Sequence, residues 1–278
     1  MRVQSILSAA AVAALVAGLS GQASALSLKV TITNIAPNGG TFLTPVWVGF
    51  HNGSFDSYDG GSASAPELEA LAEDGNTAPI SNVFGANGTL VATGTAQTGA
   101  RVQGTLGGLL APGASTMGTF QVDNAGANRY LSYASMVLPS SDYYVANGNP
   151  LAHDLSGLNI GDTLSFFIGA PGTVNDAGTE VNDFATSAGN PLFGIPGGQG
   201  GPNQGADEGG VNVNVASPFS NFLNIPTGGV APELNFNNYQ NGIARVDVEA
   251  VPVPAPVMLM GAVMAGAGFV ARRKAKKA

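Results

Sequence analysis

Three carboxylates fall within ten residues at positions 174–183, where the sequence reads V-N-D-A-G-T-E-V-N-D. The acidic residues are Asp176, Glu180 and Asp183, and no Lys or Arg occurs between residues 130 and 244 to neutralise them. Carboxylate, amide and hydroxyl oxygens on a glycine-bent loop suit a hard, oxygen-seeking cation such as calcium. A solvated acidic turn is the alternative, because Asp, Asn and Gly are also ordinary turn residues.

The first 25 residues have the three parts of a secretory signal peptide. Arg2 is followed by an apolar run over residues 6–19 and then by the small residues Ala23-Ser24-Ala25. This pattern predicts export, with cleavage before Leu26.

Residues 251–278 also have three parts: the Pro-rich V-P-V-P-A-P, an uncharged run over 257–271, and a basic end. The uncharged run followed by a basic end predicts a C-terminal transmembrane helix whose basic residues stay in the cytoplasm. The helix would be short, because the run would span about 22 Å, less than the roughly 30 Å hydrocarbon core. The arrangement resembles the C-terminal sorting signals of the PEP-CTERM type, in a V-P-x-P-A variant, although Pro-Glu-Pro is absent. The resemblance implies processing by an exosortase-type enzyme.

Residues 26–250 remain as one domain, long enough to bury a sizeable core. All 18 acidic residues lie in it, against four basic ones, which gives a net charge of −14. Such a domain repels nucleic acid and anionic surfaces and attracts cations. The chain has no Cys, so disulfides do not hold the exported domain together. The four basic residues are Lys29, Arg101, Arg129 and Arg245.

The domain reads as a series of short strands separated by Asn, Gly and Pro. Alternating or continuous apolar residues predict strands at 26–35, 46–50, 89–92, 115–122, 130–138, 163–168 and 243–250, with a further alternation at Val211, Val213 and Val215. Residues 194–210 are rich in glycine and are expected to form an exposed loop. The pattern predicts an all-β fold, an antiparallel β-sandwich.

One short helix is expected at residues 64–74. Ser64 is predicted to be its N-cap, with Glu67 completing a capping box and Pro66 in the first turn. Gly75 should end the helix.

Three segments together resemble the spondin N-terminal domain. They are H-N-G-S-F-D with the helix passage A-P-E-L-E-A-L-A-E-D-G-N-T-A-P, then S-M-V-L-P-S-S-D-Y at 135–143, then N-D-A-G-T-E at 175–180. The resemblance covers roughly residues 28–248. It implies a C2-like β-sandwich with a calcium site in the loops at one end.

By position, the resemblance implies Asp142, Asp176 and Glu180 as calcium ligands, Glu180 replacing an aspartate of the family's pattern. Asp183 is a candidate extra ligand, and Asp154 a weaker one. Carboxylates gathered in this way would repel one another without a cation.

These observations favour an exported calcium-binding module, held at the cell envelope or surface or released into an extracellular matrix. Related domains in animals occur in adhesion proteins, which implies an extracellular polysaccharide or a cell-surface protein as partner. The alternative is a polysaccharide hydrolase that uses a pair such as Asp176 and Glu180 as acid and base. The single Trp and the Gly-rich setting of these carboxylates favour the non-enzymatic reading. Calcium-dependent lipid binding is a third option, which the lack of a basic patch disfavours.

Overall fold

The computed structural model of the 278-residue chain describes residues 26–86, 100–183, 190–194, 198, 204–220 and 234–252. The predicted signal peptide, the predicted transmembrane run and the predicted strand at 89–92 lie outside these ranges. Among the described residues, no helix has the length and apolar character needed to cross a membrane.

The described chain is mostly β, and every strand pairing in it is antiparallel. One sheet has four strands in the order β5-β1-β11-β8, and the other has seven, in the order β10-β9-β7-β6-β3-β4 with β2 beside β6. The strands are β1 (Leu26–Asn34), β2 (Phe42–Leu43), β3 (Val46–His51), β4 (Val102–Leu106), β5 (Ser115–Val122), β6 (Tyr130–Leu138), β7 (Tyr143–Ala146), β8 (Thr163–Ile168), β9 (Val174–Asp176), β10 (Val213–Val215) and β11 (Ala244–Val251).

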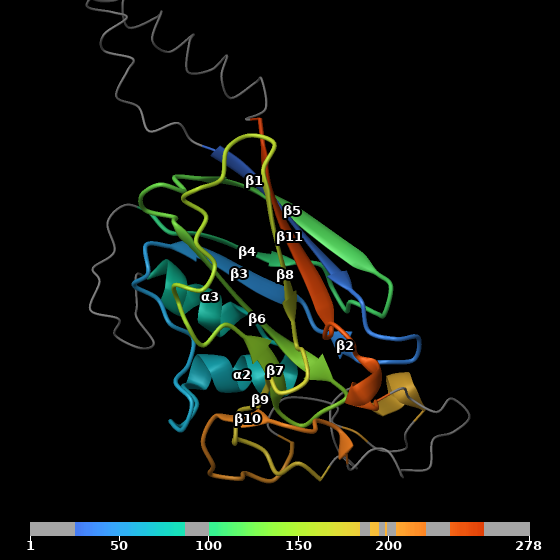
Figure 1. Cartoon of the computed structure of the whole chain (residues 1–278). Coiled ribbons are helices and arrows are strands. Elements are labelled where there is room, and N and C mark those ends of the chain that lie inside the picture. The colour runs from blue at the N-terminus through green and yellow to red at the C-terminus, as the bar shows by residue number, and fades with distance from the viewer. Residues whose placement is uncertain are drawn as a thin grey trace, which may run out of the picture.

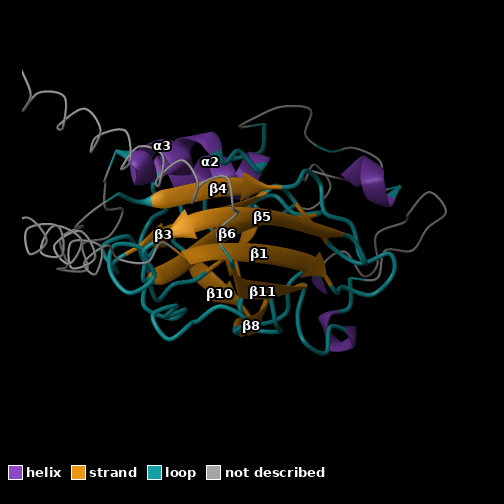
Figure 2. Cartoon of the chain, turned by 90° about the horizontal axis from the view of Figure 1, so that it is seen from above, coloured by secondary structure: helices purple, strands orange, loops and turns teal. Residues whose placement is uncertain are grey.

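Two α-helices, α2 (Pro66–Asp74) and α3 (Ala78–Gly85), lie together at one side of the strands (Figures 1 and 2). Short 3-10 turns occur at Asn190–Phe193 and Phe236–Asn238. Among the described residues the predicted all-β antiparallel sandwich is confirmed, with two α-helices where the sequence indicated one.

Strand β1 is one of the two inner strands of the four-stranded sheet, and its alternation shows which of its faces is buried. Leu28, Val30 and Ile32 are fully buried and face the main core, whereas the residues between them lie on the outer face. Val30 stands opposite Val248 of β11 and Gly118 of β5. Side chains of one parity therefore form the inner surface of this sheet.

Strand β3 is buried on both faces, and its side chains divide between two cores. Val48 and Phe50 pack into the core between the sheets, and Trp47 packs with Phe55 and Phe84 on the helix side. The seven-stranded sheet is thus a middle layer, covered by the other sheet on one face and by the helices on the other.

Helix α2 differs from its prediction at its first residues. Ala65 is the N-cap and makes no side-chain capping bond. The Ser64 hydroxyl instead donates to the Ala177 carbonyl at 2.9 Å and lies 2.8 Å from Asn212 Oδ1. The capping-box assignment was therefore wrong, because the same hydroxyl ties the chain to the β9 region. Gly75 ends the helix as predicted, with φ of 65°.

Helix α3 was missed, since the sequence after residue 75 read as β. It begins with a proline in its first turn and buries only Ile80 and Phe84. Eight residues with two buried apolar side chains give a weak helical period. The packing of Phe84 against Trp47, with ring centroids 5.1 Å apart, holds the helix in place.

The contact between β3 and the helices leaves no room at Gly49. A Cβ there would lie 2.6 Å from two Trp47 ring atoms and 2.9 Å from Phe84. We expect Gly49→Ala to lower the free energy of unfolding by about 1–3 kcal/mol in urea denaturation, because overpacking displaces the aromatic rings.

Gly108→Ala is the matched control, since a Cβ at Gly108 meets nothing within 4 Å. It should change the free energy of unfolding by less than about 0.5 kcal/mol. Equal effects of the two substitutions would contradict the packing described for β3.

Candidate metal centre

Strands β7, β9 and β10 lie side by side at the end of the seven-stranded sheet, near helix α2 (Figure 1). Asp142 occupies the turn between β6 and β7, and Asp176 is the last residue of β9. Tyr143 of β7 stands opposite Asp176, which in turn stands opposite Val213 of β10. Two residues 34 positions apart in the sequence are thus brought together by strand pairing.

The turn that carries Asp142 is shaped by the serine that precedes it by two positions. The Ser140 hydroxyl donates to the Val137 carbonyl at 2.5 Å and accepts from the Tyr143 N–H at 3.0 Å. These two bonds close the turn and fix where the Asp142 side chain begins.

Asp142 is fully buried, at 0% exposure. Its Oδ2 accepts the N–H of Thr179 at 2.8 Å, the N–H of Glu180 at 3.1 Å and the Thr179 hydroxyl at 3.2 Å. Its Oδ1 is buried and has no hydrogen-bond partner. A buried carboxylate oxygen without a donor or a cation is costly.

Asp176 is 9% exposed, and both of its oxygens are engaged. Oδ1 accepts the Gly178 N–H at 2.8 Å, and Oδ2 accepts from the Asn182 side chain at 2.6 Å. Gly178 has φ of 66°, and a Cβ there would lie 2.5 Å from the Val211 nitrogen. Glycine at this position therefore allows the loop after β9 to lie directly against the chain that leads into β10.

The third acidic residue of the group comes from residues 204–210, which we call the strap. The strap runs along the loop after β9, with Glu208 N–H donating to Thr179 O at 2.9 Å and Gly210 N–H to Gly178 O at 2.7 Å. One oxygen each of Asp142, Asp176 and Glu208 lie within 4.8 Å of one another. Glu208 is solvent-exposed, so the group is open to water on that side.

Glu180, predicted as a ligand, is not a member of this group of three. Its carboxylate Oε1 accepts the Gly205 N–H at 2.7 Å, and its backbone pairs with Asp207. Glu180 is only 2% exposed and holds the strap that carries Glu208. Glu208 was not predicted as a ligand, because its Gly-rich surroundings indicated an exposed loop.

The weaker candidates lie elsewhere. Asp183 is exposed and outside the group, and Asp154 forms a bidentate pair with Arg129. His51 is fully buried, and its Nε2 lies 2.9 Å from the Ser132 hydroxyl oxygen. His153 stacks on a phenylalanine ring with centroids 3.7 Å apart.

The electrostatics of the group favour a cation. Burial raises the pKa of Asp142 to about 7, and the neighbouring Asp176 charge adds to the rise, against the bonds from Thr179 and Glu180. Burial and then Asp176 also raise the pKa of Glu208. Two of the three acids therefore resist ionisation while no cation is near.

The donor set fits calcium by chemistry and by size. All three side chains offer carboxylate oxygens, and the chain offers no thiolate. Two ligand oxygens on opposite sides of a calcium ion are about 4.8 Å apart, since each bond is about 2.4 Å. The arrangement can thus hold a calcium-sized ion.

No family model matches the chain, and no curated protein does. The relationship to the spondin domain stays a prediction from its sequence motifs.

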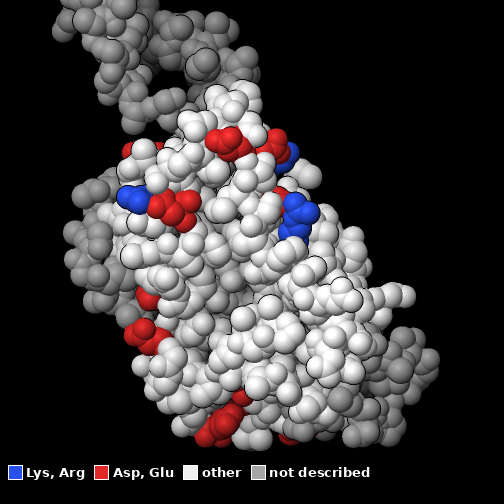
Figure 3. All heavy atoms as spheres, in the orientation of Figure 1, with Lys and Arg blue, Asp and Glu red and all other residues white. Residues whose placement is uncertain are grey.

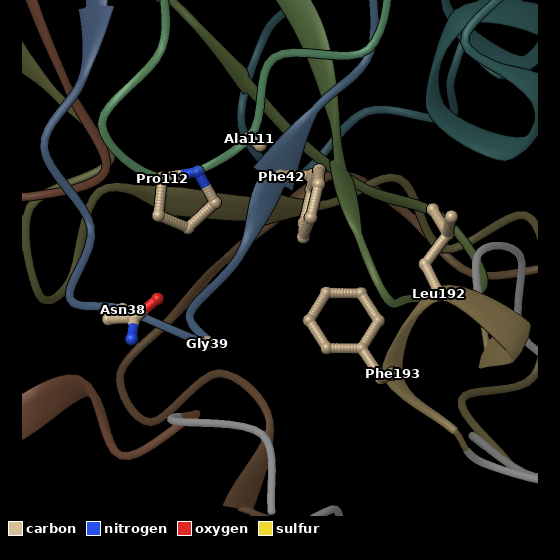
Figure 4. A pocket seen from close by; sticks show the side chains of 7 residues that line it. All are labelled: Asn38, Gly39, Phe42, Ala111, Pro112, Leu192 and Phe193. Carbon is tan, nitrogen blue, oxygen red and sulfur yellow. The ribbon is translucent and has the colours of Figure 1, made fainter. Parts of the chain in front are cut away.

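A separate cavity of about 220 Å³ lies near β2 (Figure 4). Phe42 and Phe193 meet edge to face there with centroids 5.3 Å apart, and Asn38 is the one polar side chain among the described residues that line it. Its described lining residues include no acidic or histidine side chain, so they supply neither a carboxylate or imidazole metal ligand nor an acid–base pair.

The raised pKa of Asp142 predicts a pH dependence in EDTA. The folded state holds this proton up to about pH 7, whereas an unfolded Asp releases it near its ordinary pKa of 3.8. The stabilisation is complete below about pH 3.8 and is lost as the pH rises through about 7. Asp142→Asn keeps a neutral group, so the variant should become more stable than the wild type as the pH rises from 4 to 8.

Urea denaturation of both proteins across this range measures the difference directly. Burial lowers the pKa values of His51 and His153 to about 4, so these residues make the stability rise with pH, opposite to Asp142. Both proteins share this contribution, and the comparison between them cancels it. A difference that does not change with pH would show that Asp142 titrates normally in the folded protein.

Proposed function

We propose that this chain is an exported calcium-binding structural module, with Asp142, Asp176 and Glu208 as carboxylate ligands. The observation that carries the proposal is the fully buried Asp142, whose Oδ1 has no partner while two further carboxylates lie within 4.8 Å. A bound cation would supply the missing interaction and cancel the repulsion among the three groups.

Among the described residues, no Lys or Arg forms an ion pair with Asp142, Asp176 or Glu208. The described ion pairs are Lys29–Glu249, Arg245–Asp247 and Arg129–Asp154, all with partly exposed side chains. The Arg101 guanidinium lies over the rings of Phe55 and Phe84. Figure 3 shows this separation on one face, where acidic atoms toward the lower end have no basic neighbour. The compensating charge would therefore come from solution.

Calcium suits this site better than magnesium. Each of Asp142 and Asp176 is already fixed by backbone N–H donors, so its oxygens cannot rearrange freely. Calcium accepts irregular coordination by six to eight oxygens, whereas magnesium requires near-ideal octahedral geometry.

A bound ion would join three segments: the β6–β7 turn, the end of β9 and the strap. Such a cross-link would stiffen loops at one end of the sandwich, which is a structural role. The burial of Asp176 and Glu180, at 9% and 2% exposure, argues against the hydrolase alternative, because a glycosidase must bring both carboxyl groups to a bound sugar.

The proposed location follows from the signal-peptide and sorting-signal patterns at the two ends of the sequence. We propose that the domain is held at the cell surface or released into the matrix after exosortase-type processing. Its partner there would be an extracellular polysaccharide or a cell-surface protein, consistent with the resemblance to spondin domains of adhesion proteins.

Calcium should stabilise the purified protein. At a concentration 100 times Kd, binding to the native state adds about 2.7 kcal/mol, which raises Tm by roughly 5–10 °C. Asp142→Asn should abolish this rise, measured by differential scanning calorimetry with and without calcium. Asp59→Asn, which alters an exposed carboxylate outside the group, should retain it. A wild-type Tm that is the same in calcium and in EDTA would refute the proposal.

Glu208 and Glu180 should differ in how they affect the site. Glu208→Gln removes an exposed ligand, so we expect calcium affinity to fall about 10- to 100-fold with little change in the stability of the calcium-free protein. Glu180→Gln weakens the bond to Gly205 and should lower both the calcium affinity and the stability of the calcium-free protein. Isothermal titration calorimetry and urea denaturation in EDTA separate the two effects. Identical behaviour of the two variants would show that Glu180 is a ligand after all.

A further inference from the structure

We infer that strand β8 is an interface edge, at which a second copy of this chain adds its own β8 as an antiparallel strand. The two four-stranded sheets are then joined across a two-fold axis. The inference concerns the sheet that does not carry the acidic group, so it is independent of the proposed calcium binding.

Strand β8 is the last strand of its sheet. It pairs with β11 on one side, and no described strand pairs with it on the other. The opposite edge strand, β5, differs, because β4 of the second sheet packs beside it, whereas β11 is the strand with which β8 makes extensive contact. Figure 2 shows β8 at the margin of the strands, on the side away from the helices.

The backbone of β8 has donors and acceptors along its free side. Asp162, just before the strand, accepts the Ala250 N–H at 2.9 Å. Bonds to a neighbouring antiparallel strand come from every second residue, so the even-numbered residues of β8 bond toward β11. The N–H and C=O groups of Thr163, Ser165 and Phe167 therefore point away from β11, and no described residue outside the sheet bonds to them.

The sequence of the strand permits self-pairing. T-L-S-F-F-I contains neither a charged residue nor Pro, which are features that exposed edges use to prevent strand addition. A two-fold register centred on Ser165 pairs Thr163 of one copy with Phe167 of the other, and Ser165 with itself. Each of these pairs would exchange two hydrogen bonds. This register therefore uses all three of the outward-facing residues.

The apolar side chains of β8 are incompletely covered within one copy. Phe167 is 51% exposed, and Leu164 and Phe166 are only partly buried although they pack against the main core. The same register places Leu164 of one copy beside Phe166 of the other on the inner face. A second β8 thus continues the core across the edge, which is why we assign the edge to another copy of this chain.

The charge near β8 is balanced, although the domain as a whole is strongly acidic. Lys29–Glu249 and Arg245–Asp247 are ion pairs on the neighbouring strands β1 and β11. The net charge of −14 over residues 26–250 still produces long-range repulsion between copies, which salt screens. The association should therefore become tighter as the ionic strength rises.

Analytical ultracentrifugation of the full chain should show a monomer–dimer equilibrium that shifts toward the dimer in higher salt. Ser165→Pro should weaken the association about 10- to 100-fold, because proline removes an outward-facing N–H without breaking a bond to β11. Met117→Pro is the matched control. Met117 is 65% exposed on β5, the opposite edge strand, so this substitution should leave the association unchanged.

A cysteine at the centre of the strand tests the register. The chain has no Cys, so a disulfide in Ser165→Cys can form only between copies. The Cα atoms of a hydrogen-bonded pair are about 5.5 Å apart, which is within reach of a disulfide. Oxidised glutathione should therefore convert Ser165→Cys to a covalent dimer on non-reducing gels, and Met117→Cys should stay largely monomeric.

A wild-type chain that sediments as a monomer at every concentration overturns the inference. A dimer that persists unchanged in Ser165→Pro also overturns it, because another surface then forms the contact. If Ser165→Pro fails to fold, the cysteine variants decide the matter: cross-linking of Ser165→Cys that does not exceed that of Met117→Cys rules out pairing through β8.

Discussion

The fold has to accommodate five buried carboxylates without a buried Lys or Arg in the described residues. The five are Asp56, Glu73, Asp142, Asp176 and Glu180. Moving an ionised carboxylate out of water costs several kcal/mol even after the protein relaxes, and a whole domain is stable by only about 5–15 kcal/mol. These groups therefore cannot all be charged and uncompensated, and each must be stabilised by donors, by a proton or by an external cation.

Backbone N–H groups provide part of the compensation, and the strand arrangement determines where they point. Asp142 receives two N–H groups from the loop after β9, Asp176 receives one from Gly178, and Glu180 receives one from the strap. Each donor comes from a segment that also contributes an acidic residue to the region. The same chain crossings that bring the negative charges together thus supply partial positive charges, but they leave oxygens of Asp142 and Glu73 without partners.

Sequence patterns predicted the structure best where the pattern depends only on local backbone geometry. Alternation predicted β1, and Gly75 marked the end of α2, because both signals depend on local geometry alone. The carboxylates Asp142 and Asp176 were found from motifs. Strand β9 was read as an acidic loop, since V-N-D has turn composition, and only its pairing with β7 and β10 makes it a strand.

Glu208 and the true role of Ser64 could not be found in this way. Glu208 reaches the site because Gly205, Gly210 and their neighbours bond to the loop after β9. Ser64 bonds to Ala177 and Asn212, which lie 113 and 148 residues along the chain. Interactions of such separation depend on the whole topology, and composition near a residue does not reveal them.

The register of β9 determines whether Asp176 lies beside the other acidic residues. Tyr143 pairs with Asp176, and Asp176 with Val213, so three strands converge beside the acidic group. A slip of one residue in β9 would turn Asp176 to the opposite face and bring Asn175 or Ala177 to its place. Strands of only three residues have few pairing bonds to prevent such a slip. A cation shared by the β6–β7 turn, β9 and the strap would favour a single register, because only that register brings its ligands together. In such an arrangement the ion and the end of the sheet would specify each other, which would account for costly buried acids at this edge of a domain without disulfides.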